Sequence, residues 1–355
     1  MTNFQSDVVP IVTSKKESRL NYIDSLRGLS AILVVFSHAY FFLTINHFFI
    51  NIGKVGVFVF FLISGFVIPF SFKKGPGSYK VFITTRFFRL YPAYWASMII
   101  AVLIYFIFDG KIPGFKEVVS NLTMFQMGIG QPNIIGVYWT LFIELIFYIV
   151  CIFLAWRNIL WDEKGMIKTF YFFSLLSILV SVARFFLHMK FPVAVPLGLS
   201  LMFLGCAWRF FLLEGSEYVK SKIIKMIVFC IVTTFLSSYL SYSWDIQAEE
   251  PWQNFAFAYS IGIVTFAILT KFVRINSTLM CFLGSISYSL YLVHDPVIHL
   301  FRELNTLFLI EYSTGYRLPA IIASIAIAFL LYVVVEKPSI SIGRNITKRI
   351  KASCK

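Results

Sequence analysis

Two ionisable side chains in one apolar stretch, Arg27 and His38, are the first candidates for chemistry. They lie in the segment YIDSLRGLSAILVVFSH, residues 22–38. Their separation of eleven residues returns to within about 20° of one helical face, about 16 Å along the axis. A helix here would carry an arginine at one membrane surface and a titratable imidazole near the bilayer middle. Such intramembrane groups mark candidate functional sites, with a histidine that merely bonds a neighbouring helix as the alternative.

A second candidate is Glu144, in the apolar stretch YWTLFIELIFYIV. It lies near the middle of its expected span, where an unpaired acid costs about 2.5–3.5 kcal/mol on insertion scales. His38 is the histidine expected at a similar depth. We therefore predict a contact between His38 and Glu144, which would fix the imidazole tautomer and raise its basicity. The alternative is a protonated Glu144 bonded within its own helix, where Thr140 and Tyr148 share its face.

Two arginines, Arg86 and Arg89, lie in the basic stretch TTRFFRLYPAYW. Residues three apart share a helical face, so both guanidinium groups would point from one face at the cytoplasmic end of a span. Planar guanidinium groups suit bidentate recognition of phosphate better than ammonium groups do. A basic amphipathic helix resting on anionic lipid headgroups is an equally good interpretation of the charge alone.

A polar stripe in ISYSLYLVHDPVI contains Ser287, Tyr291 and His294. These positions follow the spacing i, i+4, i+7 and so share one face of a helix. Pro296 would free backbone groups locally. Hydrogen bonding between helices is the more common use of such a stripe, and direct participation in catalysis is the alternative.

The composition is that of a membrane protein. Of 355 residues, 59% are hydrophobic and 14% are charged. Long apolar runs of about 20 residues are typical of transmembrane helices. The net charge of +14 would suggest nucleic acid for a soluble protein, but here it indicates a bias of Lys and Arg to the cytoplasmic face. The cysteines lie in apolar runs or near the basic C-terminus, so we expect neither disulfides nor a metal site.

The sequence thus predicts an all-α, polytopic integral membrane protein with about ten transmembrane helices and both termini in the cytoplasm. Residues 1–20 would be a polar cytoplasmic tail, residues 21–338 the membrane domain and residues 339–355 a basic cytoplasmic tail. This topology puts 24 of the 31 Lys and Arg residues inside, as the positive-inside rule favours. The expected spans are residues 28–48, 55–72, 91–108, 136–156, 169–188, 196–213, 223–240, 254–273, 278–298 and 318–335.

Several stretches together resemble one family, the acyltransferase 3 family of integral-membrane acyltransferases. They are YIDSLRGLSAILVVFSH, GKVGVFVFFLISGF, RFFRLYP, YWTLFIELIFY, SYSLYLVHDP and VEKPS. They occur in family order across residues 22–338. Many relatives carry an esterase-like domain after the tenth span, and we expect this chain to be the stand-alone form.

The resemblance implies an O-acetyltransferase that moves an acyl group, usually acetyl from acetyl-CoA, to a hydroxyl of a cell-envelope saccharide. O-antigen, capsule and exopolysaccharide are such acceptors. The Arg-x10-His pattern of the family matches Arg27 and His38 and makes His38 the general base. Glu144 matches the acidic position of the fourth span. Arg86 and Arg89 match the pattern associated with the acyl donor, and Arg27 would lie on the same cytoplasmic side.

The remaining substrate contacts are less narrowly defined. Ser64, Trp139 and Tyr291 are candidates for stabilising the oxyanion, and His294 joins them as a candidate substrate contact. The expected partners are acetyl-CoA, a saccharide or lipid-linked saccharide and the bilayer, without nucleic acid or a metal. The expected location is the bacterial cytoplasmic (inner) membrane.

Two alternatives stay open at this point. The enzyme could transfer succinyl or another acyl group, or it could use a lipid-linked or small-molecule sugar as acceptor. A saccharide transporter or flippase could instead use His38 and Glu144 as a proton relay. Consumption of acyl-CoA would separate the enzyme from the transporter.

Overall fold

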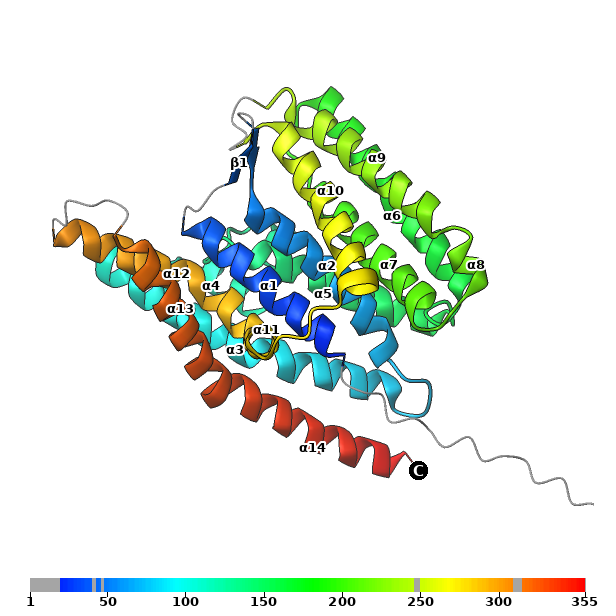
Figure 1. The fold of residues 1–355 in the computed structure, drawn as a ribbon. Coiled ribbons are helices and arrows are strands. Elements are labelled where there is room, and N and C mark those ends of the chain that lie inside the picture. Colours follow the sequence, from blue (N-terminus) through cyan, green and yellow to red (C-terminus); the bar gives the residue numbers. More distant parts are fainter. Residues whose placement is uncertain (1–19, 40–42, 46–47, 246–249, 309–314, 355) are drawn as a thin grey trace, which may run out of the picture.

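The computed structural model describes residues 20–39, 43–45, 48–245, 250–308 and 315–354 (Figure 1). This part of the chain is a helical bundle with one short hairpin. The long helices are α1 Asn21–His38, α2 Ile52–Ser71, α3 Ser78–Asp109, α5 Tyr138–Trp156, α6 Glu163–Leu187, α7 Ala194–Leu212, α9 Ile223–Tyr242, α10 Trp252–Ile268, α12 Ser287–Leu307, α13 Arg317–Leu331 and α14 Lys337–Ser353. The shorter ones are α4 Phe115–Leu122, η1 Gln126–Ile129, α8 Glu217–Lys220, η2 Leu269–Val273, α11 Thr278–Ser285 and η3 Tyr332–Glu336.

Eight helical segments in the described ranges are long and apolar enough to cross a membrane. They include all of the long helices except α1 and α12, with α13 and α14 counted together. The protein is therefore a multi-pass integral membrane protein, as predicted. Helices α1 and α12 have 18 and 21 residues, but both carry charged side chains. With α1 and the α11–α12 pair, every predicted span has a helical counterpart.

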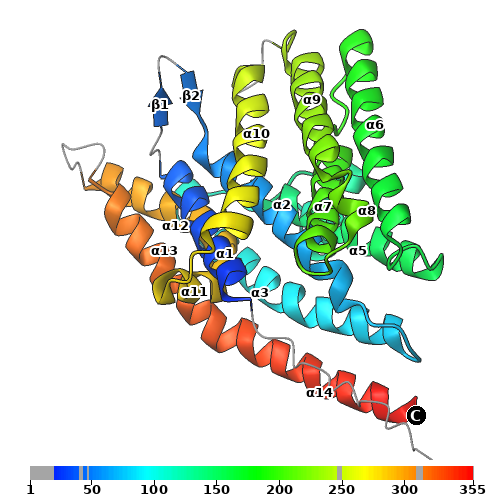
Figure 2. The same cartoon turned by 45° about the vertical axis from the view of Figure 1, so that its right-hand side comes forward.

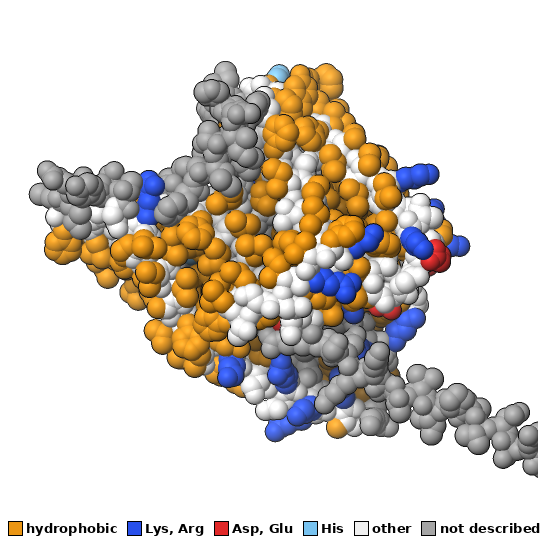
Figure 3. Space-filling view, in the orientation of Figure 1, with side chains coloured by type: hydrophobic (Ala, Val, Ile, Leu, Met, Phe, Trp, Pro, Cys, Tyr) orange, Lys and Arg blue, Asp and Glu red, His pale blue; other side chains and the backbone are white. Residues whose placement is uncertain are grey.

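The surface agrees with a membrane environment. Figure 3 shows hydrophobic side chains over most of the face in view, with Lys and Arg side chains gathered along its lower edge and lower right. The N-terminal end of α3 and all of α14 lie along this edge (Figure 2). A basic rim below an apolar surface is the pattern that the positive-inside rule predicts for the cytoplasmic side.

The first span was predicted at the wrong position. Helix α1 runs from Asn21 to His38, whereas residues 28–48 were expected to form the span. Residues Leu43–Ile45 and Phe48–Ile50 instead form an antiparallel hairpin, β1–β2. Aromatic and β-branched residues dominate this stretch, and they favour strands. His38 therefore lies at the end of its helix rather than at the middle of a longer one.

Other helices extend beyond their predicted limits. Helix α3 is continuous over 32 residues, so the arginine pair Arg86 and Arg89 belongs to the third span itself. Most of the segment predicted as a basic tail lies in α14, which continues from α13 through the π-helical turn η3 and packs against α3 (Figure 2). The predicted polar tail at 1–20 lies outside the described residues except for Leu20.

Close helix packing surrounds α2, which contacts α1, α7 and α10. Gly65 of α2 and Gly205 of α7 make this possible. A Cβ atom on Gly65 would overlap the backbone of Met202, and one on Gly205 would overlap the backbone of Leu62. The two helices thus touch backbone to backbone, as small residues allow in membrane bundles.

We expect Gly65→Leu to destabilise the folded protein, because the new side chain must displace the backbone of α7. Overpacking of a core typically costs about 1–3 kcal/mol, and here no flexible side chain can yield. Thermal unfolding in detergent and the yield of monodisperse protein would measure the effect. Gly136→Ala is the matched control, since its Cβ would meet open space. Equal melting temperatures for the two variants would contradict the prediction.

Candidate active site

A cavity of about 490 Å³ lies between α1, α2, α3, α5, α7, α12 and α14. It brings together six of the residues proposed from the sequence, Arg27, Ser64, Arg86, Arg89, Glu144 and Tyr291. Its charged lining residues are Asp24, Arg27, Arg86, Arg89, Glu144, Arg209 and Arg344. Five guanidinium groups against two carboxylates give the cavity a positive lining, which favours an anionic ligand.

Arg86 shows how the arginine side of the cavity is built. Its Nη2 group donates to Ser71 Oγ, and its guanidinium carbon lies 5.3 Å from the ring centroid of Phe82 and 5.4 Å from that of Tyr148. Its Nε group is buried and has no hydrogen-bond partner among the described residues. Unpaired buried donors are uncommon in folded proteins, and a bound anion would satisfy this one. Arg89 follows three residues later on the same helix and lines the same cavity.

Glu144 does not contact His38, so that predicted pairing is wrong. The carboxylate of Glu144 accepts a hydrogen bond from the hydroxyl of Tyr148, one turn along α5. His38 Nδ1 lies 3.2 Å from Oδ1 of Asp295 on α12. The physical reason is the position of α1, which ends at His38 and brings its imidazole against α12 rather than α5. Tyr148 was the partner considered in the alternative interpretation.

His38, Asp295 and His294 form a second polar group near the C-terminal end of α1. The His38 and His294 ring centroids are 4.7 Å apart with an interplanar angle of 89°. The side chains of His38 and Asp295 are 37% and 31% exposed, so this pair is open to an incoming molecule. His294 is fully buried.

The hydrogen bonds indicate the tautomer of each histidine. A backbone carbonyl only accepts, so Nδ1 of His294, 3.2 Å from Leu290 O, carries a proton. Its Nε2 then has a lone pair, and this atom is buried with no partner among the described residues. The carboxylate of Asp295 likewise favours a proton on Nδ1 of His38 and leaves Nε2 of His38 to accept one.

Tyr291 stands between the cavity and the histidines. Its ring centroid lies 5.7 Å from that of His294, and it also lines the cavity. Its hydroxyl is 2.8 Å from Thr140 Oγ1 and donates to Val137 O at 3.3 Å. Trp139 packs edge-on against Phe61 at 6.2 Å between centroids and is not among the cavity-lining residues.

Asp295 is the site residue that the sequence interpretation missed. It lies in the quoted stretch SYSLYLVHDP, directly after His294. The available signal was its position four residues after Tyr291, which places both on one face of α12. The predicted polar stripe continues from Tyr291 to His294 at i+3 and does not include this carboxylate.

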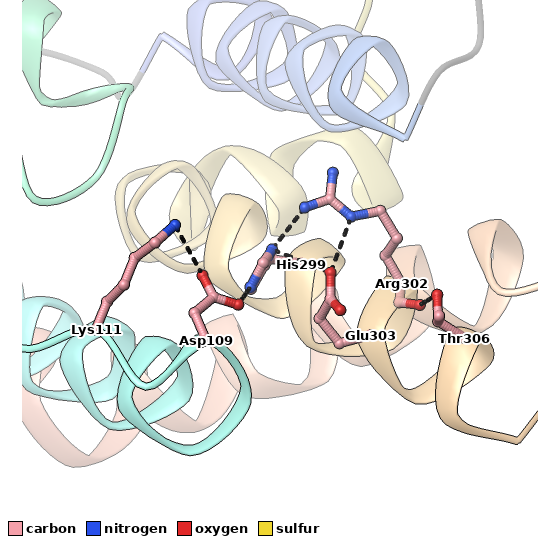
Figure 4. Close-up of polar contacts among 6 residues, drawn as sticks. All are labelled: Asp109, Lys111, His299, Arg302, Glu303 and Thr306. Carbon is pink, nitrogen blue, oxygen red and sulfur yellow. Dashed lines mark hydrogen bonds and ion pairs between the residues drawn. The ribbon is translucent and has the colours of Figure 1, made fainter.

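A separate polar cluster joins the far ends of α3 and α12 (Figure 4). Asp109, His299 and Glu303 place possible metal-ligand atoms within 4.8 Å of one another. However, His299 Nε2 already donates to Asp109 at 2.9 Å, and Arg302 Nη2 lies 2.7 Å from His299 Nδ1. Lys111 pairs with Asp109 at 3.5 Å. Because two cationic side chains occupy this cluster, we assign it to fastening α3 to α12.

The family model described as the acyltransferase domain matches residues 20–333. The chain belongs to the acyltransferase 3 family. Membership of this family favours acyl transfer over the transporter alternative. The matched region includes every site residue proposed from the sequence and ends before α14.

Three curated relatives accompany this family match. The chain is 26% identical over 325 residues to the peptidoglycan O-acetyltransferase OatA of Listeria monocytogenes, covering 79% of this chain and half of OatA. It is 32% identical over 107 residues to the acyltransferase MdmB of Streptomyces mycarofaciens, covering 28% of this chain and 27% of MdmB. It is 23% identical to nodulation protein 10 of Rhizobium leguminosarum, covering 93% of this chain and 95% of that protein. No solved structure matches the chain.

Proposed function

We propose that the protein transfers an acetyl group from cytoplasmic acetyl-CoA to a hydroxyl of a cell-envelope saccharide at the bacterial inner membrane. The observation that supports this is that α1 joins two polar sites. Arg27 lines the arginine-rich cavity, and His38 meets Asp295 eleven residues later. The helical rise separates the two positions by about 16 Å. A donor held by its phosphates at one end can present its thioester toward the other.

The donor is held by its charged end in this proposal. Arg86 and Arg89, with Arg27, supply guanidinium groups that match phosphate oxygens in bidentate geometry. The unpaired Nε group of Arg86 supports this assignment. Glu144, on the cavity wall, accepts hydrogen bonds from the amide N–H groups of the pantetheine arm. This replaces its expected role as the partner of His38.

His38 acts as the general base. Its Nε2 accepts the proton of the acceptor hydroxyl while the hydroxyl oxygen attacks the thioester carbonyl carbon. Asp295 holds Nδ1 and stabilises the imidazolium that forms. The carbon–sulfur bond then breaks, the imidazolium returns the proton to the departing thiolate, and the products are an O-acetyl ester and coenzyme A. General base catalysis contributes about 10²–10⁴-fold.

Three further side chains contact the reacting groups in this proposal. The hydroxyl of Ser64, which lines the cavity, can donate to the developing oxyanion. Tyr291 lines the same cavity, and it can donate to the oxyanion only if its hydroxyl turns away from Val137 O. The unpaired Nε2 of His294 can accept a hydrogen bond from a second hydroxyl of the acceptor. A saccharide offers several neighbouring hydroxyls, which suits two histidines 4.7 Å apart.

The saccharide acceptor is supported by one relative. OatA is a peptidoglycan O-acetyltransferase, and peptidoglycan is a saccharide polymer of the cell envelope. The alignment spans half of OatA, and we propose for this chain an acceptor of the same chemical class. Succinyl donors and lipid-linked or small-molecule acceptors are the outcomes that the experiment must separate.

The test uses purified protein in lipid nanodiscs with acetyl-CoA that is labelled in the acetyl group. The acceptor is the saccharide fraction of cells that lack the gene. We expect release of free coenzyme A thiol to match the appearance of label that mild alkali removes, as an O-acetyl ester requires. Succinyl-CoA in a parallel reaction tests the donor, and His38→Ala is the inactive control. Saccharide movement without thiol release would overturn the proposal.

A further inference from the structure

The cavity wall includes a helix that lies beyond the family match. Ile340, Gly343 and Arg344 of α14 line the cavity together with Arg86 and Arg89. The matched region ends at residue 333, within η3 and before α14. Ile340, Gly343 and Arg344 also follow the stretch VEKPS, so this part of the candidate donor site lies beyond the family match and beyond the family motifs.

Two contacts fix α14 against the bundle. Glu336, at the end of η3, is 2% exposed, and its carboxylate accepts a hydrogen bond of 2.7 Å from Ser289 Oγ on α12. Gly343 packs on α3 so closely that a Cβ atom would lie 2.8 Å from Phe88 Cβ. Helix α14 is therefore held at both the bundle core and α3, and its inner face has a defined position beside the cavity.

The charge of α14 suits an anion. The sequence KPSISIGRNITKRIKAS contains five basic residues and no acidic one. Among its basic residues in the described chain, Arg344 is the one that lines the cavity. Arg344 is exposed, which places its guanidinium at the mouth rather than in the interior. Arg86 and Arg89 continue the same positive lining inward from α3.

We propose that α14 is the outer wall of the donor site and that Arg344 binds a phosphate of the acyl-CoA donor at the cavity mouth. This inference rests on the proposed function, in which the cavity holds acyl-CoA. The ligand chemistry is a phosphate ester. An anionic lipid headgroup offers the same chemistry at this membrane surface, so the experiment has to distinguish the two sources.

The test compares Arg344→Ala with Arg349→Ala, an exposed basic residue of α14 that does not line the cavity. Each variant is assayed in nanodiscs of neutral phosphatidylcholine with acetyl-CoA and with S-acetyl-pantetheine, which lacks phosphates. For Arg344→Ala we expect the KM for acetyl-CoA to rise about tenfold with kcat nearly unchanged. The KM for S-acetyl-pantetheine should stay at the wild-type value. Arg344→Lys, which keeps the charge, should restore part of the affinity.

Each contrary outcome has a separate meaning. A wild-type KM for Arg344→Ala, with a raised KM for Arg86→Ala, would overturn the inference and leave the proposed function standing. An effect of Arg344→Ala that appears only in nanodiscs with phosphatidylglycerol, and equally for both donors, would assign Arg344 to lipid. A wild-type protein that neither binds nor consumes acetyl-CoA would overturn both proposals.

Discussion

Replacing His38 with Gln should reduce acetyl transfer by about 10²–10⁴-fold, the usual contribution of a general base. Glutamine keeps a polar side chain of similar reach but cannot take the proton of the acceptor hydroxyl. Its Nε2 group can still donate to Asp295, so the contact between α1 and α12 can be kept. The measurement is kcat for release of coenzyme A thiol in nanodiscs at saturating acetyl-CoA. Binding of acetyl-CoA at the arginine-lined cavity should stay unchanged.

Two neighbouring variants separate the base from its supports. Asp295→Asn should lower kcat by less than His38→Gln, because the imidazole stays in place and loses only its orienting carboxylate. His294→Gln should raise the KM for the saccharide, since the proposal gives this residue an acceptor contact. Normal acetylation by His38→Gln at normal protein level would remove His38 from the reaction. A loss of kcat in His294→Gln as large as expected for His38 would make His294 the base.

The sequence alone predicted four charged residues that line the cavity. Arg27, Arg86, Arg89 and Glu144 each stood out as a charged residue at or inside an apolar helix, and helical spacing assigned their faces. All four line one cavity. A charged side chain inside a membrane helix costs free energy unless it has a partner or a function. A charge within an expected span therefore indicates a candidate site residue even when the tertiary structure is unknown.

The sequence could not identify Asp295 as the partner of His38 in the same way. The depth of a side chain in the membrane depends on where its helix begins and ends. Hydropathy placed the first span at residues 28–48, but Asn21–Ile23 already belong to α1. The aromatic and β-branched residues after His38 form strands instead. Because α1 begins and ends earlier than the predicted span, His38 lies beside Asp295 instead of at the depth expected for Glu144.

Helix α14 was not predicted, because its sequence is basic rather than apolar. Its basic sequence reads as a tail when hydropathy is the guide, yet the contacts of Glu336 and Gly343 hold it on the bundle. Both contacts are made with helices far away in the sequence, to Ser289 and Phe88. No local sequence pattern predicts contacts between residues so far apart in the chain. The position of Arg344 at the cavity therefore follows only from the three-dimensional structure.

The double variant Arg86→Ala/Arg89→Ala should weaken acetyl-CoA binding by about 10²–10⁴-fold, because each charge-assisted hydrogen bond is worth about 1.5–3 kcal/mol. The reason is that both guanidinium groups line the cavity from one face of α3. Calorimetric binding of acetyl-CoA to the protein in neutral nanodiscs measures the loss. Arg86→Lys/Arg89→Lys keeps the charge without the planar fork and should recover part of the affinity.

Lys80→Ala is the matched control for this variant, since Lys80 is exposed on the same helix and does not line the cavity. It should bind acetyl-CoA like the wild type, which separates a specific site from general attraction by the basic surface. Raising the salt concentration should weaken the binding only modestly, because a partly buried pair is screened less than exposed charges. Retained binding by Arg86→Ala/Arg89→Ala would move the donor site away from α3. It would also remove the reason for Arg27, Glu144 and Arg344 to share a ligand with this pair.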